Sequence, residues 1–280
     1  MILVGDSGST KTDWRLIENN QILSQHSCEG LNPHFHTSDT VLEEIKICFD
    51  LELSDQITEV HFYGSGCSTE EKKQIAREAF KTYFTKAKLF IEHDLLGAAR
   101  AACGKQQGLS GILGTGSNCC LYDGSNIVQE NRSGGFMISD EGGGVHIGKL
   151  VLKNYIEKCF SDDLMNRFEK RYQTHYDEIL TNLYKKPYPN RYMASFSKFA
   201  YHNRKEPVIQ ELILTCFRAY FRNQVCRFEE HQNMPLNLVG SIAFYYQDLI
   251  RAAAEEFSVR VGTILEKPIS GIANFHLDLD

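Results

Sequence analysis

The chain has 280 residues, of which 42% are hydrophobic and 24% are charged, and its formal net charge is −6. This length and composition are typical of a globular protein with a full core and about two domains. The acidic balance, without a long basic block, argues against general nucleic-acid binding, and no stretch of about 18 apolar residues could span a membrane. The chain enters a strand at once, without the basic segment of a signal peptide, so we expect a cytoplasmic protein.

The nine cysteines are an odd number and lie mostly in apolar runs. They form no Cys-x-x-Cys pair and show no His/Cys spacing typical of a zinc site. We therefore expect buried, reduced thiols.

The chain opens with a short apolar strand, residues 1–4, and a turn of glycine and hydroxyl residues, Ser7–Thr12, follows it. Glycine lets the backbone approach a ligand closely, and the turn offers N–H and hydroxyl donors to an anion. Asp6, at the end of the strand, could hold a divalent cation directly or through water. The combination predicts a site for a Mg-bound polyphosphate, with an ordinary tight turn as the alternative.

The same stretch nearly matches the P-loop pattern G-x-x-x-x-G-K-[ST], except that Thr10 stands where the second glycine belongs. A P-loop is followed by a helix whose N-terminus holds the phosphate. Here a strand at 13–17, an Asn-rich turn and another strand follow. The sequence therefore favours a β-hairpin over a P-loop.

Downstream, to residue 103, the pattern alternates between helix and strand. The predicted elements are a loop at 30–36, a helix capped by Ser38 or Asp39 and reaching about residue 50, a strand at 59–64, a helix that starts from a capping box at 68–71 and reaches about residue 84, a strand at 88–94, and a helix from 95 to about 103. This alternation predicts an α/β layer fold with parallel pairing.

The opening pattern recurs between residues 112 and 128. A strand leads into a second turn of glycine and hydroxyl residues, Gly114–Ser117, and a second hairpin closes at 127–128. Two such hairpins, one at the start of each half, suggest two related domains that face each other across a cleft.

The rest of the chain is predicted to be largely helical. A glycine-rich segment at 134–144 precedes a helix to about residue 159, and a mostly helical region at 162–232 is broken at 186–189. A strand-to-turn at 236–241, a helix to about 257, a strand at 259–265 and a tail with a turn and a short helix complete the chain.

Four motifs follow one another along the chain: Gly5–Thr12, Gly114–Asn118, Gly135–Phe136 with Asp140–Gly142, and Val239–Ser241. Together they resemble the actin/hexokinase/Hsp70 ATPase superfamily, and within it the BadF/BadG/BcrA/BcrD-type ATPase family and its N-acetylglucosamine kinase branch. The resemblance implies an α/β fold of two duplicated ribonuclease H-like domains, the actin-like ATPase fold, which clamp Mg-ATP in a central cleft. The domains would cover residues 1–110 and 111–280, with a helical insertion at about 160–232.

The resemblance also implies roles for individual residues. Asp6 would hold Mg, Asn32 would bind a sugar hydroxyl, and Asp140 would bind the sugar or a metal-bound water. Gly135 and Phe136 would form the wall against an N-acetyl group. The residues implied in ATP binding are Ser7, Gly8, Ser9, Thr10, Lys11, Thr12, Gly114, Thr115, Gly116, Ser117, Gly240 and Ser241.

Asp94 matches the position of the catalytic base in these sugar kinases. A carboxylate at the C-terminal end of a strand could take the proton of a sugar hydroxyl, which is typically worth ~10²–10⁴ in rate. Asp94 could instead only cap the helix that begins at Leu95, and Asp140 could cap the helix after Gly144.

The implied reaction is transfer of the γ-phosphoryl group of ATP to an amino sugar, N-acetylglucosamine at its 6-hydroxyl, by an enzyme that uses Mg. A homodimer is implied by the resemblance alone. The sequence departs from the family where Ser7 and Ser9 replace consecutive glycines and where Phe136 replaces a common tryptophan. It therefore constrains the ATP site more than the identity of the sugar.

Two other functions remain as alternatives. A related activator of reductases or dehydratases would need cysteine ligands for an iron–sulfur cluster, but the helix after Gly144 begins without cysteine and Cys119–Cys120 lies in a predicted hairpin. A sugar or ATP sensor without turnover would need neither Asp6 nor Asp94, and both are present.

Overall fold

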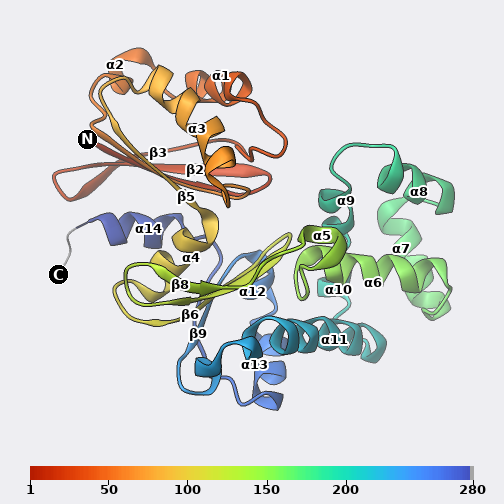
Figure 1. Cartoon of the computed structure of the whole chain (residues 1–280). Coiled ribbons are helices and arrows are strands. Elements are labelled where there is room, and N and C mark those ends of the chain that lie inside the picture. The colour runs from red at the N-terminus through yellow and green to blue at the C-terminus, as the bar shows by residue number, and fades with distance from the viewer. Residues whose placement is uncertain (278–280) are drawn as a thin grey trace. The chain divides into compact units, whose positions relative to one another are not determined.

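The computed structural model describes residues 1–277, which form two compact units (Figure 1). Unit 1 consists of residues 1–110, 122–128 and 267–277, and unit 2 consists of residues 111–121 and 129–266. The chain thus passes into unit 2 after residue 110 and returns to unit 1 twice, and the second return brings the last helix there. The domain bounds of the sequence analysis stay a prediction.

Unit 1 is built on a five-stranded mixed sheet with the order β3-β2-β1-β4-β5. Its strands are β1 (Ile2–Ser7), β2 (Lys11–Glu18), β3 (Gln21–Glu29), β4 (Glu59–Gly64) and β5 (Lys88–His93). The first three strands form the predicted antiparallel hairpins, and β4 and β5 continue the sheet in parallel from β1. The register places Asp6 opposite Asp13 and Ser7 opposite Thr12.

Helices cover both faces of this sheet (Figure 1). The helices on one face are α1 (Ser38–Cys48), α2 (Leu51–Ser54) and α3 (Glu70–Tyr83), and those on the other are α4 (Asp94–Cys103) and α14 (Ile269–His276). α14 lies so close to α4 that a Cβ at Gly271 would come within 2.6 Å of the carbonyl oxygen of Ala101. This packing, between helices far apart in sequence, ties the end of the chain to unit 1.

The core of unit 1 surrounds Trp14, the only tryptophan of the chain, which is fully buried. Its ring packs against Phe49, Phe62 and Phe80 at centroid distances of 5.5, 5.7 and 6.0 Å. Trp14 points inward because buried residues alternate along this part of β2. Gly5, its partner on β1, leaves room for the indole, since a Cβ there would lie 2.3 Å from the ring.

A second five-stranded sheet has the order β10-β9-β6-β7-β8. Its strands are β6 (Gly108–Leu113), β7 (Ser117–Tyr122), β8 (Ile127–Glu130), β9 (Leu236–Val239) and β10 (Val261–Leu265). From the opposite edge, the order β8-β7-β6-β9-β10 repeats the order of the first sheet. The α/β class and the duplication implied by the resemblance are therefore confirmed.

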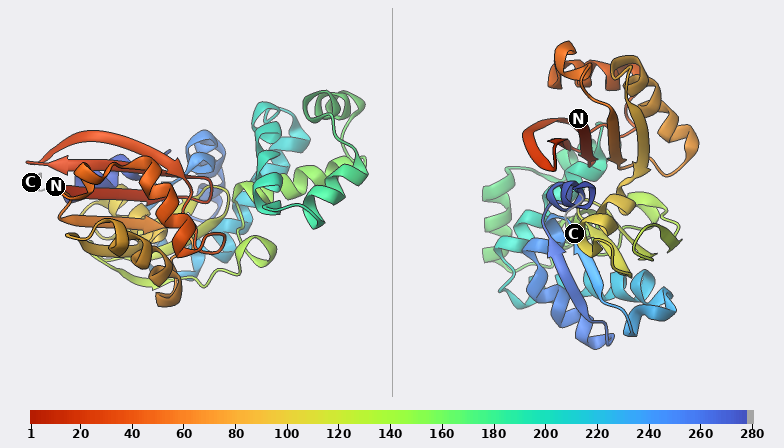
Figure 2. Two further views of the ribbon diagram at one scale, coloured as in Figure 1. Left: turned by 90° about the horizontal axis from the view of Figure 1, so that it is seen from above. Right: turned by 90° about the vertical axis from the view of Figure 1, so that its left-hand side faces the viewer.

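The helices of unit 2 include the helical region predicted at 162–232. They are α5 (Gly135–Ile138), α6 (Gly144–Ile156), α7 (Asp162–Tyr172), α8 (Tyr176–Tyr184), α9 (Pro189–Ser195), α10 (Ser197–His202), α11 (Pro207–Asn223), the short 3-10 helices η1 (Val225–Arg227) and η2 (Glu229–Gln232), α12 (Ser241–Tyr245) and α13 (Gln247–Glu256). Helices α7 to α10 form a lobe beside the sheet of this unit (Figure 2).

Two details differ from the sequence prediction. The predicted single helix after residue 241 is two helices, α12 and α13, with Tyr246 between them at φ −111° and ψ 19°. The cap of α1 is Thr37 rather than Ser38 or Asp39, because Thr37 and Thr40 exchange hydrogen bonds between side chain and backbone in a capping box.

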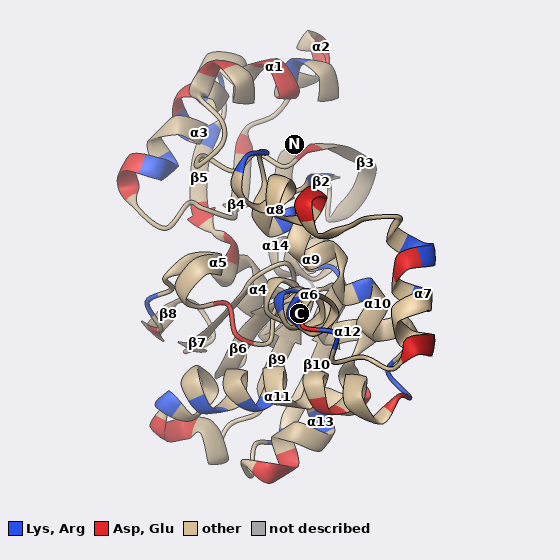
Figure 3. Cartoon of the chain, turned by 90° about the vertical axis from the view of Figure 1, so that its right-hand side faces the viewer, with Lys and Arg blue, Asp and Glu red and all other residues tan. Residues whose placement is uncertain are grey.

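Both signs of charge occur along the helices of unit 2, as Figure 3 shows for α11 and α13. Arg218 of α11 pairs with Glu211 at 2.6 Å and with Glu256 of α13 at 2.8 Å. Among residues 1–277, the structure contains no helix of the length and apolar character that crossing a membrane requires.

The cysteines lie in different surroundings. Those that are buried are Cys67, Cys119, Cys120 and Cys216, and those that are half-buried are Cys28, Cys48, Cys103 and Cys226. Cys159 is exposed, so the expectation of buried thiols is wrong there.

Candidate functional site

The predicted phosphate turn of unit 1 joins β1 to β2. A hydrogen bond from the N–H of Gly8 to the carbonyl of Lys11 (2.9 Å) closes the turn, and Gly8, Thr10 and Lys11 are exposed. The nearest described atom to a Cβ built on Gly8 is the carbonyl oxygen of Lys11, at 3.7 Å. The backbone at this tip is therefore accessible to an anion.

Ser7 and Thr12 hold this turn from the inside, and both side chains are fully buried. The hydroxyl of Thr12 lies 2.8 Å from Ser7 Oγ and 2.9 Å from the carbonyl of Glu29, and Ser7 Oγ accepts a hydrogen bond from the N–H of Leu31 (2.9 Å). Both hydroxyls are thus engaged within the protein. They stabilise the turn from within, and the part of Ser7 and Thr12 in ATP binding stays a prediction.

Gly30 belongs to this site although the motif analysis did not single it out. Its N–H donates to the carbonyl of Thr10 (3.1 Å). A Cβ at Gly30 would come within 2.5 Å of the carbonyl oxygen of Gly8 and 2.8 Å of the backbone of Ser9 and Thr10. The loop after β3 therefore packs directly against the turn, and only glycine leaves room for that contact.

Three acidic residues of unit 1 interact at this edge of the sheet. Burial, followed by the negative charges of Asp94 and Asp13, raises the pKa of Asp6 to about 8. Asp13 faces Asp6 across the hairpin, where like charges repel. Lys11 Nζ lies 2.7 Å from one Asp13 carboxylate oxygen, and Lys267 Nζ lies 3.9 Å from the other. The sequence analysis did not single out Asp13. Pairing the two strands of the predicted hairpin would have placed it opposite Asp6.

A magnesium ion fits this edge of unit 1. Within the described part of the chain, no three His, Cys, Asp or Glu side chains are grouped so that they could hold a metal by themselves. Mg²⁺ usually binds one or two carboxylates and completes its shell with water and substrate phosphates. A cation beside Asp6 would also offset the repulsion that raises its pKa, so the carboxyl groups present suit such an ion.

Asp94 is the first residue of α4, directly after β5, where the sequence places it. The N-cap of α4 is His93, and no side-chain capping hydrogen bond is present at this described helix start. The capping alternative therefore does not describe Asp94. Its Oδ1 lies 3.1 Å from His93 Nε2, and each side chain is 22% exposed. The carboxyl group is thus oriented by its neighbour and still accessible.

Asn32 lies in the loop after β3 and is 6% exposed. Its Oδ1 accepts a hydrogen bond from the N–H of His34 (2.9 Å), and its Nδ2 donates to Ser65 Oγ (3.5 Å). A Cβ at Gly66 would come within 2.4 Å of this Oδ1, so the turn after β4 also positions the amide. The role of Asn32 in sugar binding stays a prediction.

The second phosphate turn, in unit 2, joins β6 to β7. The N–H of Gly114 donates to the carbonyl of Gly116 (3.0 Å). The first turn of α6 holds the outer carbonyls, since the N–H of Gly144 donates to Gly114 (2.8 Å) and that of Val145 donates to Thr115 (2.9 Å). These donors would otherwise be unsatisfied at the helix start, so α6 and the turn stabilise each other.

Asp140 contacts this second turn. Its Oδ1 accepts a hydrogen bond from the N–H of Ser117 (3.1 Å), and a Cβ at Gly116 would lie 2.7 Å from its carboxylate. The N-cap of α6 is Gly143, so Asp140 does not cap that helix. Its part in binding sugar or metal-bound water stays a prediction.

The predicted adenosine-binding residues lie beside the second turn. Gly240 has φ +124°, and a Cβ there would come within 2.3 Å of the carbonyl oxygen of Leu113 and 3.1 Å of the nitrogen of Gly114. Ser241 follows as the first residue of α12 and is exposed. The structure of unit 2 thus brings together two motifs that are far apart in sequence.

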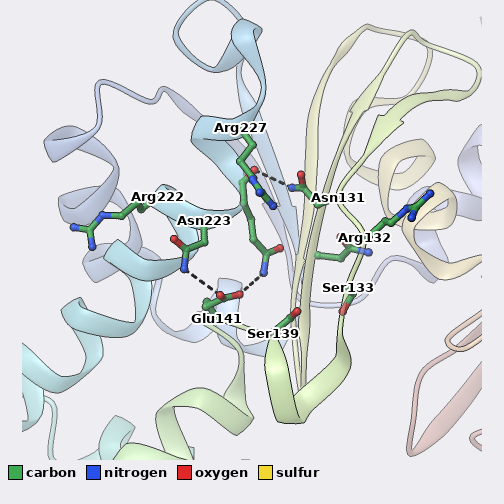
Figure 4. A pocket seen from close by; sticks show the side chains of 10 residues that line it. Asn131, Arg132, Ser133, Ser139, Glu141, Arg222, Asn223 and Arg227 are labelled. Carbon is green, nitrogen blue, oxygen red and sulfur yellow. Dashed lines mark hydrogen bonds between the residues drawn. The ribbon is translucent and has the colours of Figure 1, made fainter.

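A polar pocket of about 290 Å³ opens beside the second turn (Figure 4). Glu141 accepts hydrogen bonds from Asn223 Nδ2 (3.0 Å) and Gln224 Nε2 (3.1 Å), and Gln224 Nε2 also lies 2.9 Å from Ser117 Oγ. Burial raises the pKa of Glu141, but its hydrogen bonds outweigh burial and keep the pKa below its ordinary value. Sequence reasoning did not find Gln224, because nothing in the sequence at the end of α11, which Gln224 follows, indicates its contact with this turn.

Gly135 and Phe136 begin the short helix α5. Gly135 has φ +66°, and no described atom lies within 4 Å of a Cβ built there. Phe136 lines a smaller pocket of about 130 Å³ together with residues of α6, among them His146 and Lys149. A wall against an N-acetyl group, as implied by the resemblance, stays a prediction.

Comparison with known proteins identifies the fold and the family. No protein-family model matches the sequence, and no curated protein does. The solved structure of a candidate N-acetylglucosamine kinase from Porphyromonas gingivalis matches with a TM-score of 0.94 and 31% identity, over 100% of this chain and 99% of that chain. A candidate N-acetylglucosamine kinase from Chromobacterium violaceum matches with a TM-score of 0.73 and 14% identity, over 98% of both chains. A ROK family glucokinase from Streptomyces griseus, in complex with glucose and AMPPNP, matches with a TM-score of 0.55 and 12% identity, also over 98% of both chains.

The two duplicated sheets and these matches define the fold as that of the actin-like, two-domain sugar kinases. The identity to the Porphyromonas gingivalis protein over the full length shows more: the chain belongs to the sugar-kinase family of that protein. The enzyme class expected from the sequence is thereby confirmed at the level of the family. The narrower BadF/BadG/BcrA/BcrD assignment stays a prediction.

Proposed function

We propose that this chain transfers the γ-phosphoryl group of ATP to the 6-hydroxyl of N-acetylglucosamine. The observation that carries the proposal is the 31% identity, over the whole chain, to the candidate N-acetylglucosamine kinase of Porphyromonas gingivalis. The accessible turn tip of unit 1, the acidic residues beside it and the second turn of unit 2 support it.

Asp94 is the proposed base, which accepts the proton of the attacking sugar hydroxyl. Its contact with His93 Nε2 (3.1 Å) restrains the carboxylate, and its partial exposure leaves it open to a substrate. A base of this kind contributes typically ~10²–10⁴ in rate. In phosphoryl transfer, positioning and charge stabilisation supply most of the remainder.

Asp6 is the proposed metal carboxylate. Bound Mg²⁺ would neutralise charge on the phosphates of the nucleotide. Asp6 must lose its proton to hold the ion, and its raised pKa makes this step dependent on pH. The backbone at Gly8 faces the phosphates in this proposal, and Lys11, whose side chain is 52% exposed, can exchange Asp13 for a phosphate oxygen.

In unit 2 we assign the N–H groups of Thr115 and Gly116 to the phosphates. The carbonyl of Thr115 is occupied by α6, and the neighbouring N–H of Ser117 is occupied by Asp140. Gly240 and Ser241 would pack against the adenosine, since Gly240 already lies against the strand that leads into this turn.

The sugar would be recognised by four of the residues predicted from the sequence. Asn32 presents an amide that its loop holds in place, and Asp140 presents a carboxylate beside the second turn. Gly135 and Phe136 would contact the N-acetyl group, because Phe136 lines an open pocket.

A coupled assay of ADP release tests the proposal. The full chain would be supplied with Mg-ATP and, in turn, N-acetylglucosamine, N-acetylmannosamine, glucosamine, glucose or no sugar. We expect the highest kcat/KM with N-acetylglucosamine and a product phosphorylated at the 6-hydroxyl by NMR. A higher kcat/KM with N-acetylmannosamine would overturn the substrate, and no sugar-stimulated ADP release from folded protein would overturn the kinase reaction.

The Asp94→Asn variant tests the base. We expect kcat to fall by about 10²–10⁴ while sugar affinity, measured by calorimetry, changes little. Asp55→Asn is the control, because the Asp55 side chain is 61% exposed and forms an ion pair with Lys86 on the surface of unit 1. An Asp94→Asn enzyme with full turnover and unchanged sugar affinity would exclude the base role.

A further inference from the structure

The polar pocket of unit 2 has no part in the proposed reaction. It lies between the end of α11, with η1, and the segment that joins β8 to α6 (Figure 4). Its lining consists of four side-chain amides, two hydroxyls, three arginines and one carboxylate. None of these residues is among those assigned above to ATP or to the sugar. Its volume of about 290 Å³ is close to the lower end of the ~300–1,000 Å³ that is typical of small-molecule sites, so the pocket suits a compact, polar ligand.

The three arginines give this pocket a positive charge. Arg222 lies in the last turn of α11, Arg227 in η1 and Arg132 shortly after β8, and all three are exposed. None of them forms an ion pair with another residue of the described part of the chain. Figure 4 shows Arg227 pointing into the pocket, with Arg222 and Arg132 on opposite sides of it. Because the chain as a whole carries a net charge of −6, three unpaired guanidinium groups around one cavity favour an anionic ligand.

One carboxylate in the same pocket restricts the kind of anion. Glu141 is held in place by hydrogen bonds from Asn223 Nδ2 (3.0 Å) and Gln224 Nε2 (3.1 Å). A carboxylate has about four acceptor sites, so Glu141 can also accept from a ligand. Gln224 is 6% exposed, and its Oε1 has no hydrogen-bond partner among the described residues. These acceptors favour a ligand that carries hydroxyl groups in addition to its negative charge.

We propose that this pocket binds a phosphorylated monosaccharide. The phosphate would pair with Arg227, because a guanidinium group can donate two parallel hydrogen bonds to phosphate oxygens. Arg132 and Arg222 add to the positive field at the sides of the pocket. The sugar hydroxyls donate to Glu141 and to the Gln224 amide. Inorganic phosphate makes only the first set of contacts, and Glu141 repels it.

This binding does not depend on the proposed function. The reaction proposed above produces a compound of the same chemical class, but the pocket would hold such a compound whether or not the chain transfers a phosphoryl group. Binding is therefore measured in the absence of ATP, with the full-length chain.

Calorimetry with glucose 6-phosphate and with inorganic phosphate tests the proposal. We expect glucose 6-phosphate to bind more tightly than inorganic phosphate. Arg227→Ala should weaken the binding of both by about tenfold or more, since it removes a charge-assisted pair. Arg260→Ala is the control and should bind as the parent protein does, because Arg260 is an exposed arginine directly before β10 that does not line the pocket. Unchanged binding of both anions by Arg227→Ala would overturn the site.

Glu141→Gln tests the recognition of the sugar. The loss of negative charge strengthens the binding of both anions, so the informative quantity is the ratio of the two affinities. This ratio should fall by about fivefold in favour of inorganic phosphate, because hydroxyl groups bond more strongly to a carboxylate than to a neutral amide. An unchanged ratio would overturn the monosaccharide as the ligand.

Thermal unfolding of each variant shows whether the substitution alters the fold. If Arg227→Ala unfolds at a lower temperature than the parent, Arg227→Lys repeats the test with the charge kept. It should bind glucose 6-phosphate more weakly than the parent, because lysine lacks the planar fork of donors, and parent-like affinity would exclude the pairing with Arg227. Intact binding in a protein without kinase activity would support the pocket and count against the proposed function alone.

Discussion

His276 of α14 is expected to make unit 1 sensitive to acid. Its ring packs on His61 of β4 with centroids 4.0 Å apart, and its Nε2 lies 2.8 Å from the hydroxyl of Tyr63. Burial, followed by the neighbouring His61 and Arg100, lowers its pKa from the ordinary 6.5 to about 3. The helix therefore docks with a neutral imidazole, and a proton there would be held beside two other basic groups.

The sign and size of the effect follow from this shift. Because the folded pKa of His276 is depressed, the unfolded chain binds the proton more readily, and stability is lost as pH falls below 6.5 and down to about 3. At 1.36 kcal/mol per unit of pKa, the loss is about 1.4 kcal/mol at pH 5.5 and about 2.7 kcal/mol at pH 4.5. Burial also lowers the pKa of His61, which acts in the same direction.

Urea unfolding, followed by the fluorescence of Trp14, measures this loss in unit 1. Between pH 7.5 and 5.5, the parent protein should lose about 1.4 kcal/mol more than His276→Gln, whose amide cannot titrate. His36→Gln, in the loop before α1, should keep the pH dependence of the parent. Equal pH dependence of the parent and His276→Gln would refute the reasoning.

Three further predictions concern the turns and the metal. Gly240→Ala should destabilise the protein by about 1–3 kcal/mol in thermal unfolding, because a Cβ at φ +124° would meet the carbonyl oxygen of Leu113 at 2.3 Å. Gly114→Ala is the control and should leave the stability unchanged, because no described atom lies within 4 Å of its new Cβ. Mg-dependent ATP binding, measured by calorimetry, should strengthen as pH rises from 7 to 9, because Asp6 has a pKa of about 8 and must be ionised to hold the ion. Asp13→Asn should move the midpoint of this pH dependence to lower pH, since it removes a negative charge that raises the pKa of Asp6. An unmoved midpoint would contradict the assignment of Asp6 as the metal carboxylate. Thr12→Val should cost about 1–3 kcal/mol in urea unfolding, since it removes a buried donor, and unchanged stability would argue against its bracing role.

Sequence reasoning worked where the decisive physics is local. The turn between β2 and β3 was predicted from its asparagines, and Asn19 and Asn20 both adopt positive φ there, at 49° and 57°. The start of α3 was also predicted, and Thr69 caps it by accepting from the N–H of Lys72; this is a simple N-cap rather than the predicted capping box, because Lys72 has no side-chain acceptor to return the bond. The position of Asp94 directly after its strand follows in the same way, because strand ends depend on a few neighbouring residues.

The contacts that complete the candidate site were decided by the tertiary structure. Asp13 and Gly30 acquire their roles from the hairpin register and from a loop that packs against the first turn. Gln224 meets Ser117 across more than a hundred residues of sequence. Residue type and spacing carry no information about such meetings, because they depend on how whole elements pack.

The sequence by itself determined the alternation of strands and helices, the two glycine turns, and the acidic residues Asp6 and Asp94 at the ends of two predicted strands, since these follow from periodicity and backbone freedom. Only the folded chain decided that α14 returns to unit 1, that Ser7 and Thr12 face inward, and that the pKa of Asp6 is raised. Burial and electrostatic repulsion are properties of the assembled sheet and its helices, and no single segment possesses them alone.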